Sequence, residues 1–406
     1  MLPAHIVSAL PLSFLLAIKM AAAQPSPEMI LHNMDTNRDG RISRQEWRGP
    51  PPRFDVLDSN RDGFITREEL ESASRRRQTT FAARISPVDV HVHLHGDPSG
   101  TVGERLIIDY AAAADEAIAQ MDKNNVRMSV IMIPPAVHFG RFRYQSLLAE
   151  AKRRPDRFAV LAGGGTLNPV IHATAPGNVT EEIRRSFEEE AERALRAGAI
   201  GFGEMSALHL SYFKQHPFEE AAPDHPLFLL LSDIAARSDV PIDLHIDLVV
   251  EDMPTPAKLR EASANNPPRL KANLDGFDRL LAHNPKTRII LSHSVDGTGG
   301  RKAAVIRRLL ERHPNLSMSL NVLPGYLFLE NLPLKGTGGI APDWMQLIKD
   351  FPDRFLIGSD QFYSPPCPTC KSRNVLTPSL RWLKLLPDEI AKKVAVENPR
   401  RIFKLK

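Results

Sequence analysis

Eight apolar runs rich in β-forming residues alternate with amphipathic stretches from residue 88 onward. The runs occupy residues 88–93, 127–134, 158–167, 199–205, 241–247, 287–294, 316–322 and 354–360. The clearest helical patterns between them lie at 180–197 and 302–312. Such alternation predicts an α/β fold, a (β/α)8 TIM barrel with insertions over residues 88–406. Continuous apolar runs such as RIILSHS fit parallel strands that are buried on both faces.

The carboxyl ends of these predicted strands carry side chains that bind metals. His91 and His93 stand two residues apart in the first strand, so both imidazoles point the same way and can reach one ion. The fourth, fifth, sixth and eighth strands end in Glu204, His245, His293 and Asp360. Strand ends of a barrel gather at one face, so we expect the six side chains to form one metal site. The chain has 14 His and only 2 Cys, which indicates imidazole and carboxylate ligation.

The sequence around these residues resembles that of the metal-dependent amidohydrolase superfamily. The segments DVHVH, LSH and GSD and the closing ENPRRIF are most similar to its amidohydrolase-related branch, over about residues 87–406. That branch includes lactonases, carboxy-lyases that act on aromatic or muconate-type acids, and uncharacterised hydrolases. The resemblance is specific for fold and metal site and poor for substrate.

The resemblance implies a role for each ligand. Glu204 looks like the bridging carboxylate of binuclear hydrolases; then His91, His93 and Asp360 hold one ion, and His245 and His293 hold a second. In the mononuclear alternative, His245 joins the first three and His293 contacts water or substrate. Asp360 is expected to accept a proton from the attacking water. Zn²⁺ is the favoured ion, with Mn²⁺ as the alternative.

Several functions stay open at this stage. We expect an exported hydrolase of ester, lactone or amide bonds that acts on a small-molecule substrate. The alternatives are a carboxy-lyase on the same fold, a calcium-binding surface-association protein with an inactive barrel, and a nuclease or phosphoesterase. The net charge of +4 on 406 residues is a weak field and argues against nucleic acid as a partner.

Two loops upstream of the barrel match the EF-hand calcium pattern. They read DTNRDGRISRQE at 35–46 and DSNRDGFITREE at 58–69. The predicted ligands supply the oxygens that Ca²⁺ prefers; they are Asp35, Asn37, Asp39, Arg41 and Glu46 in the first loop and Asp58, Asn60, Asp62, Phe64 and Glu69 in the second. Two complete matches predict a small all-α module over residues 24–72 that binds two Ca²⁺ ions. The run Gly49-Pro50-Pro51-Pro52 predicts short helices, because proline cannot continue a helix interior.

The remaining segments indicate the cellular location and a linker, and they include the two cysteines. Residues 1–23 have an apolar core and end in Ala21-Ala22-Ala23, which predicts an export signal; no later segment is apolar enough for a membrane span. Residues 73–87 are expected to be a linker. Export implies an oxidising compartment, so Cys367 and Cys370 are expected to form a local disulfide; in a cytosolic protein the alternatives are a redox-active pair or half a zinc site.

A further group of polar residues lies close to the predicted strand ends. His95 and His209 are candidates for substrate contact, and Arg141 and Asn321 are weaker candidates for orienting an anion. Asp89 begins the first strand and is expected to be structural.

Overall fold

The computed structural model describes residues 27–73, 85–94, 109–135, 144–214, 216–293, 298–322, 339–366 and 374–406. The chain divides into two compact units, of residues 1–77 and 78–406. Within the described residues, no helix has the length and apolar character needed to cross a membrane. The predicted export signal, most of the predicted linker, His95, Arg141, Cys367 and Cys370 lie outside the described residues.

The first unit contains both EF-hand loops. Its elements in chain order are α1 (Pro27–Met34), β1 (Arg41–Ser43), α2 (Pro51–Leu57) and β2 (Phe64–Thr66), and residues 67–73 are helical. Strands β1 and β2 pair antiparallel with Ile42 opposite Ile65. These two isoleucines are fully buried and pack with Phe54, Leu57 and Leu70 in a small core. The helices are short, as the proline run predicts: residues 44–46 at the end of the first loop form only a turn.

The second unit is a barrel of parallel strands. The barrel strands are β3 (Val88–Leu94), β4 (Met128–Ile131), β5 (Phe158–Val160), β6 (Ala162–Gly163), β7 (Phe202–His209), β9 (Pro241–Ile246), β12 (Arg288–Leu291), β13 (Leu316–Leu320), β14 (Phe355–Ile357) and β15 (Gln361–Tyr363). They pair in the orders β14-β13-β12-β9-β7-β6 and β15-β3-β4-β5. The short strands β8 (Glu219–Glu220), β10 (Met253–Pro254) and β11 (Arg269–Leu270) lie in the connections.

Two interrupted strands join these sheets into one barrel. Strands β5 and β6 are separated only by Leu161, and β14 and β15 only by residues 358–360. Leu161 N donates to Ile131 O on one side, and Ala162 N donates to Gly201 O on the other. The same chain segment therefore pairs first with β4 and then leads into β7. The predicted eight-strand barrel is confirmed in this part of the chain.

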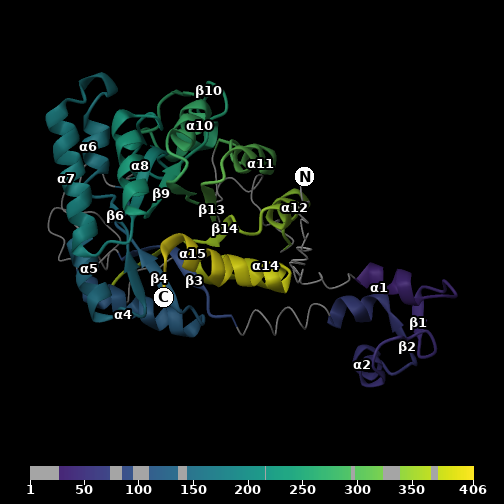
Figure 1. The fold of residues 1–406 in the computed structure, drawn as a ribbon. Helices are drawn as coiled ribbons and strands as arrows, with labels where there is room; N and C mark the ends of the chain where they lie inside the picture. Colours follow the sequence, from purple (N-terminus) through teal and green to yellow (C-terminus); the bar gives the residue numbers. More distant parts are fainter. Residues whose placement is uncertain are drawn as a thin grey trace, which may run out of the picture. The chain divides into compact units, whose positions relative to one another are not determined.

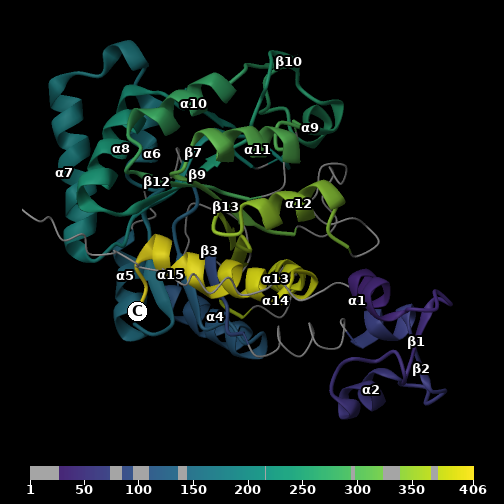
Figure 2. The same ribbon diagram turned by 45° about the vertical axis from the view of Figure 1, so that its right-hand side comes forward.

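Helices cover the outside of the strands, as Figures 1 and 2 show. They are α4 (Tyr110–Lys123), α5 (Tyr144–Arg153), α6 (Asn168–Ala173), α7 (Glu181–Ala197), α8 (Pro226–Ser238), α9 (Ala257–Ala262), α10 (Leu274–His283), α11 (Ala303–Arg312), α12 (Pro342–Asp350), α13 (Leu376–Leu385), α14 (Asp388–Lys392) and α15 (Asn398–Phe403), with η1 (Pro176–Asn178) and η2 (Lys393–Glu397). Helix α7 begins where the Thr180 hydroxyl accepts a hydrogen bond from Ile183 N, and it ends at Gly198, whose φ of 113° favours glycine.

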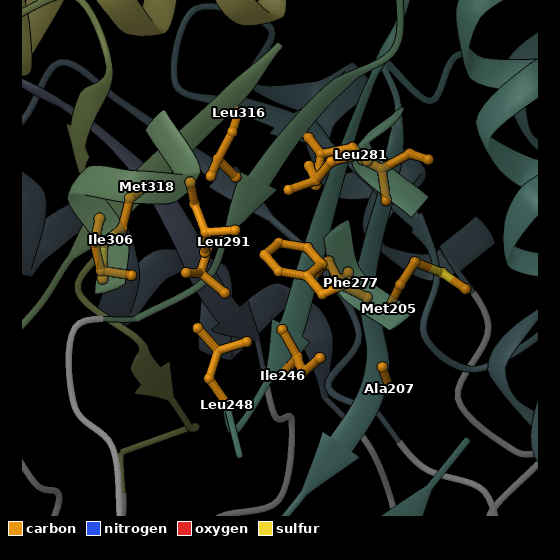
Figure 3. Packing of buried hydrophobic residues seen from close by; sticks show 14 of the residues in the cluster. Met205, Ala207, Ile246, Leu248, Phe277, Leu281, Leu291, Ile306, Leu316 and Met318 are labelled. Carbon is orange, nitrogen blue, oxygen red and sulfur yellow. The ribbon is translucent and has the colours of Figure 1, made fainter. Parts of the chain in front are cut away.

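The core has an outer and an inner layer. In the outer layer, Phe277 and Leu281 of α10 pack against strand residues such as Ile246 and Leu291 (Figure 3). In the inner layer, Val90, Leu161 and Ile290 pack with Ile402 of α15. Helix α15 thus contributes apolar side chains to the same cluster as the barrel strands, away from the carboxyl ends that carry the candidate ligands.

One strand differs from its predicted position. The run at 199–205 places Glu204 at the end of a strand, but β7 runs from Phe202 to His209, so Glu204 lies inside it. The strand is longer because Ser206 and Leu208 continue the parallel pairing with β9, and Leu208 and His209 pair antiparallel with β8. It starts later because residues 198–201 form the turn after α7.

Candidate metal centre

The structure brings all six predicted barrel ligands together. His91 and His93 come from β3, Glu204 from β7 and His245 from β9, while His293 and Asp360 lie in the turns that follow β12 and β14. The five other than Asp360 are buried, and the Asp360 side chain keeps 22% of its surface exposed. Three overlapping groups have ligand atoms within 4.8 Å of one another; they are His91, His93 and Glu204; His91, His293 and Asp360; and Glu204, His245 and His293. These distances would suit one or two metal ions.

Glu204 lies between two pairs of histidines. Its Oε2 atom is 3.5 Å from His91 Nε2 and 3.4 Å from His93 Nε2. Its Oε1 atom is 2.9 Å from His245 Nδ1 and 3.5 Å from His293 Nε2. Burial alone would raise the pKa of Glu204, but the charge of His91 and the surrounding hydrogen bonds hold that pKa well below its ordinary value. The side chain is therefore a carboxylate whose two oxygens face opposite halves of the centre.

The first half contains His91 and His93, whose Nε2 atoms are 3.1 Å apart. Each ring uses its other nitrogen elsewhere: His93 Nδ1 lies 3.0 Å from Met132 O, and His91 Nδ1 lies 3.1 Å from Asp243 Oδ1. A proton on each Nδ1, next to these oxygens, would leave two Nε2 lone pairs facing each other, an arrangement that a cation between them would stabilise. Burial lowers the pKa of His91, but the charges of Asp243 and Glu204 outweigh it and raise that pKa well above its ordinary value.

The second half contains His245 and His293. His245 presents Nδ1 to Glu204, and its Nε2 lies 3.6 Å from Asp247 Oδ2. Burial opposes the charged imidazole, yet hydrogen bonds to Asp247 and Glu204 raise the pKa of His245 to about 9. Burial lowers the pKa of His293. The negative charge that favours a proton on His245 would equally favour a bound divalent ion.

Both ligands that follow a strand have left-handed backbones. The φ angle is 64° at His293 and 60° at Asp360, which turns each side chain out of the strand direction. Asp360 N donates to His91 O, and Asp360 Oδ1 lies 3.3 Å from His93 Nε2. Burial raises the pKa of Asp360, but His293 and His93 outweigh this effect and lower it. Asp360 is thus an ionised and partly exposed carboxylate at the edge of the centre.

Two buried aspartates accept hydrogen bonds from the serines in these turns. Ser359 donates through its amide (2.8 Å) and its hydroxyl (2.5 Å) to the carboxylate of Asp89, and Ser292 Oγ donates to Asp243 Oδ1 (2.5 Å). Each serine directly precedes a left-handed ligand. Asp89 is therefore structural, as its place at the start of the first strand indicates. Burial raises the pKa of Asp89 to about 6.

Sequence reasoning did not identify Asp243 and Asp247 as part of this site. Both flank His245 at alternate positions of PIDLHID, with Asp243 and His245 on one face of β9 and Asp247 directly after the strand. This alternation in the sequence was the signal by which Asp243 and Asp247 could have been identified. Of the weaker candidates, the His209 ring lies 4.4 Å from the His245 ring, and the Asn321 amide lies 3.4 Å from His293 Nδ1.

The two EF-hand loops form closely matching hydrogen bonds. Asp35 accepts from the amides of Asp39 and Gly40, and Asp58 accepts from those of Asp62 and Gly63. The φ angles of Gly40 and Gly63 are 84° and 87°, which explains glycine at the sixth position of each loop. The last acidic residues, Glu46 and Glu69, fold back onto amides of their own loops. The remaining predicted ligands, Asn37, Arg41, Asn60 and Phe64, occupy the same loops, where a ring of oxygens suits a hard cation.

Comparison with known proteins agrees with this architecture. The family model described as amidohydrolase matches residues 88–405, and the EF hand model matches residues 30–49 and 53–73. No curated protein matches the chain.

Among solved structures, similar folds include an uncharacterised TIM-barrel protein from Bordetella bronchiseptica (16% identity, 79% of this chain and 99% of that chain, TM-score 0.47). A second is a phosphotriesterase homology protein from Escherichia coli complexed with phosphate (14% identity, 78% of this chain and 98% of that chain, TM-score 0.47). A third is dihydroorotase from Saccharomyces cerevisiae in complex with 5-fluoroorotic acid (14% identity, 79% of this chain and 84% of that chain, TM-score 0.44). At these identities and scores, the structural likeness carries no argument about substrate.

Proposed function

The chain belongs to the amidohydrolase family, and from this membership we propose that it is an exported metal-dependent hydrolase. It cleaves C–O or C–N bonds of ester, lactone or amide type. The observation that carries the proposal is the position of Glu204, whose two oxygens face two separate histidine pairs. A carboxylate placed in this way suits a pair of divalent ions.

The donor set fits two ions. His91, His93 and Asp360 with Glu204 Oε2 would hold the first, and His245 and His293 with Glu204 Oε1 would hold the second. Imidazole-rich ligation favours Zn²⁺, and the carboxylates allow Mn²⁺. A divalent ion in such a site supplies a water molecule of lowered pKa and polarises the bond to be cleaved.

The chain's own residues prepare the site for hydrolysis. Asp360 is ionised and the most exposed of the six, so it is placed to accept the proton of the attacking water and pass it to the leaving group. Phe362 lies against His93, with ring centroids 4.4 Å apart, and its side chain remains partly exposed. It forms an apolar wall beside the centre that excludes water from one side of a bound substrate.

A hydrolase is favoured over a carboxy-lyase because the bridging position of Glu204 resembles that of binuclear hydrolases. The EF-hand module, which belongs to the unit before the barrel, binds two Ca²⁺ ions through oxygen ligands. Export through residues 1–23 places the enzyme in the periplasm or outside the cell.

The test compares wild-type chain with Glu204→Gln and a matched control, Glu150→Gln. Glu150 of α5 is also buried, but it pairs with Arg154, directly after that helix, and takes no part in the centre. Wild type, recovered from periplasm or medium, should carry transition metal by elemental analysis and turn over one class in a panel of lactones, esters and amides. Loss of a ligand should exceed the roughly 10- to 100-fold loss typical of an outer partner.

The expected result for Glu204→Gln is therefore a fall in bound metal and a drop in kcat/KM of more than about 100-fold, with Glu150→Gln close to wild type. Unchanged metal content and turnover in Glu204→Gln would refute the proposed centre. Release of CO2 from aromatic acids, without hydrolysis of any panel member, would replace the hydrolase with the lyase.

A further inference from the structure

Strand β9 and the residue directly after it carry three buried ionisable side chains. Asp243, His245 and Asp247 alternate along the chain, and their exposed fractions are 0%, 7% and 1%. Burying two carboxylates is costly unless each has a partner. The partners of these two aspartates are histidines from different halves of the metal centre.

Asp243 supports the first half. Its Oδ1 atom lies 3.1 Å from His91 Nδ1, and Ser292 Oγ donates to the same oxygen. The second oxygen, Oδ2, has no hydrogen-bond partner among the described residues. A proton fixed on His91 Nδ1 leaves Nε2 free, and that nitrogen faces His93 and Glu204.

Asp247 supports the second half with the opposite nitrogen. Its Oδ2 atom lies 3.6 Å from His245 Nε2, an ion-pair contact, while His245 Nδ1 faces the centre, 2.9 Å from Glu204. The carboxylate is held by Leu210 N at 3.0 Å and Tyr212 Oη at 2.7 Å, both from the segment that follows β7. These two donors fix the direction of the carboxylate independently of any metal.

We propose that Asp243 and Asp247 are positioning residues that each tune one of the two metal sites, Asp243 through His91 and Asp247 through His245. This inference rests on the proposed two-metal centre. A carboxylate behind a metal-binding histidine fixes its tautomer and makes it a stronger ligand, and removal of such a partner typically costs 10- to 100-fold in metal affinity. Residues of one short segment, 243–247, would thus set the metal affinity of each site separately.

The test measures Zn²⁺ binding to the full chain in competition with a chromophoric chelator, with Ca²⁺ at saturation so that the EF-hand loops are filled. Asp243→Asn and Asp247→Asn keep the side-chain shape and remove the charge. Each should weaken a different one of the two bound equivalents by about 10- to 100-fold, and the double variant should weaken both.

The matched control is Asp278→Asn. Asp278 Oδ1 lies 2.8 Å from Nε2 of the buried His313, so this variant breaks a histidine–carboxylate pair that touches none of the six ligands. It should leave both affinities unchanged. Wild-type affinities in both β9 variants, or weakening of the same equivalent by both, would overturn the inference.

Two further outcomes separate this inference from the proposed function. If wild type binds no Zn²⁺ in the barrel, the proposed function fails and the inference fails with it. If Asp243→Asn does not fold by circular dichroism, Asp247→Asn decides: loss of affinity for one equivalent alone supports the inference, and unchanged affinity for both overturns it.

Discussion

In the EF-hand loops and in the metal centre, hydrogen-bond donors around the individual oxygens fix the orientation of the carboxylates. In the first EF-hand loop, Glu46 Oε1 accepts from the amides of Thr36 and Asn37, and Oε2 accepts from the amide and hydroxyl of Ser43. The hydrogen bond from the Ser43 amide contributes most to the low pKa of Glu46, about 2. The loop thus holds its last ligand ionised before any cation arrives.

This predicts the acid behaviour of the calcium-free loop. A carboxylate with a depressed pKa contributes stability above its ordinary pKa of about 4.5, and this contribution is lost as the pH falls towards 2. In the calcium-free full chain, the amide chemical shift of Ser43 should therefore stay constant from pH 6 to about 4, where an ordinary glutamate titrates. A midpoint near 4.5 would contradict this, and Glu46→Gln, which cannot titrate, is the control.

The residues that carry chemistry were only partly predictable. His91, His93 and Asp360 stand in short motifs that identify them without a structure. Asp243 and Asp247 do not, because an aspartate in an apolar run gives no sign of whether its partner is a serine, a histidine or water. For Asp243 that partner is His91 of another strand, and only the barrel places the two together.

At the scale of elements, the turn after β14 depends on one buried contact. Ser359 is fully buried and gives both its amide and its hydroxyl to Asp89. Strand positions were well predicted from apolar runs, because parallel strands buried on both faces have few polar residues. The extension of β7 to His209 was not predicted, since it comes from pairing with β8 across a connection of irregular structure.

We predict that Ser359→Ala destabilises the barrel by about 1–3 kcal/mol, because it removes a donor from a fully buried carboxylate. The measurement is denaturant unfolding of the metal-free chain, so that lost ligation does not contribute. The control is Ser238→Ala at the exposed end of α8, where a change within about 0.5 kcal/mol is expected. Equal stability of the two variants would show that the Ser359 hydroxyl is dispensable.

At the scale of the molecule, calcium and transition-metal chemistry use separate sets of residues. The oxygen-rich loops belong to the unit of residues 1–77, and all six barrel ligands belong to the unit of residues 78–406. The two family models match the same two parts of the chain. No residue is shared between the two kinds of site.

We therefore predict that the double variant Glu46→Gln and Glu69→Gln loses high-affinity Ca²⁺ binding, because each loop loses its bidentate ligand. The transition-metal content and kcat/KM of the barrel should stay within about twofold of wild type, as expected for independent sites. Calcium titration, elemental analysis and kinetics on the same preparation check this. A parallel fall in turnover would reveal coupling between the units.

The contact between Asp89 and Ser359 joins residues that are 270 positions apart. A ribosome adds about 5–20 residues per second. The synthesis of β15, which pairs with the second edge of β3, therefore follows that of β3 by an interval on the order of tens of seconds. During that time β3 can pair only with β4, and its other edge is open to any extended chain nearby. The nascent barrel therefore has an open strand edge until β15 has been synthesised.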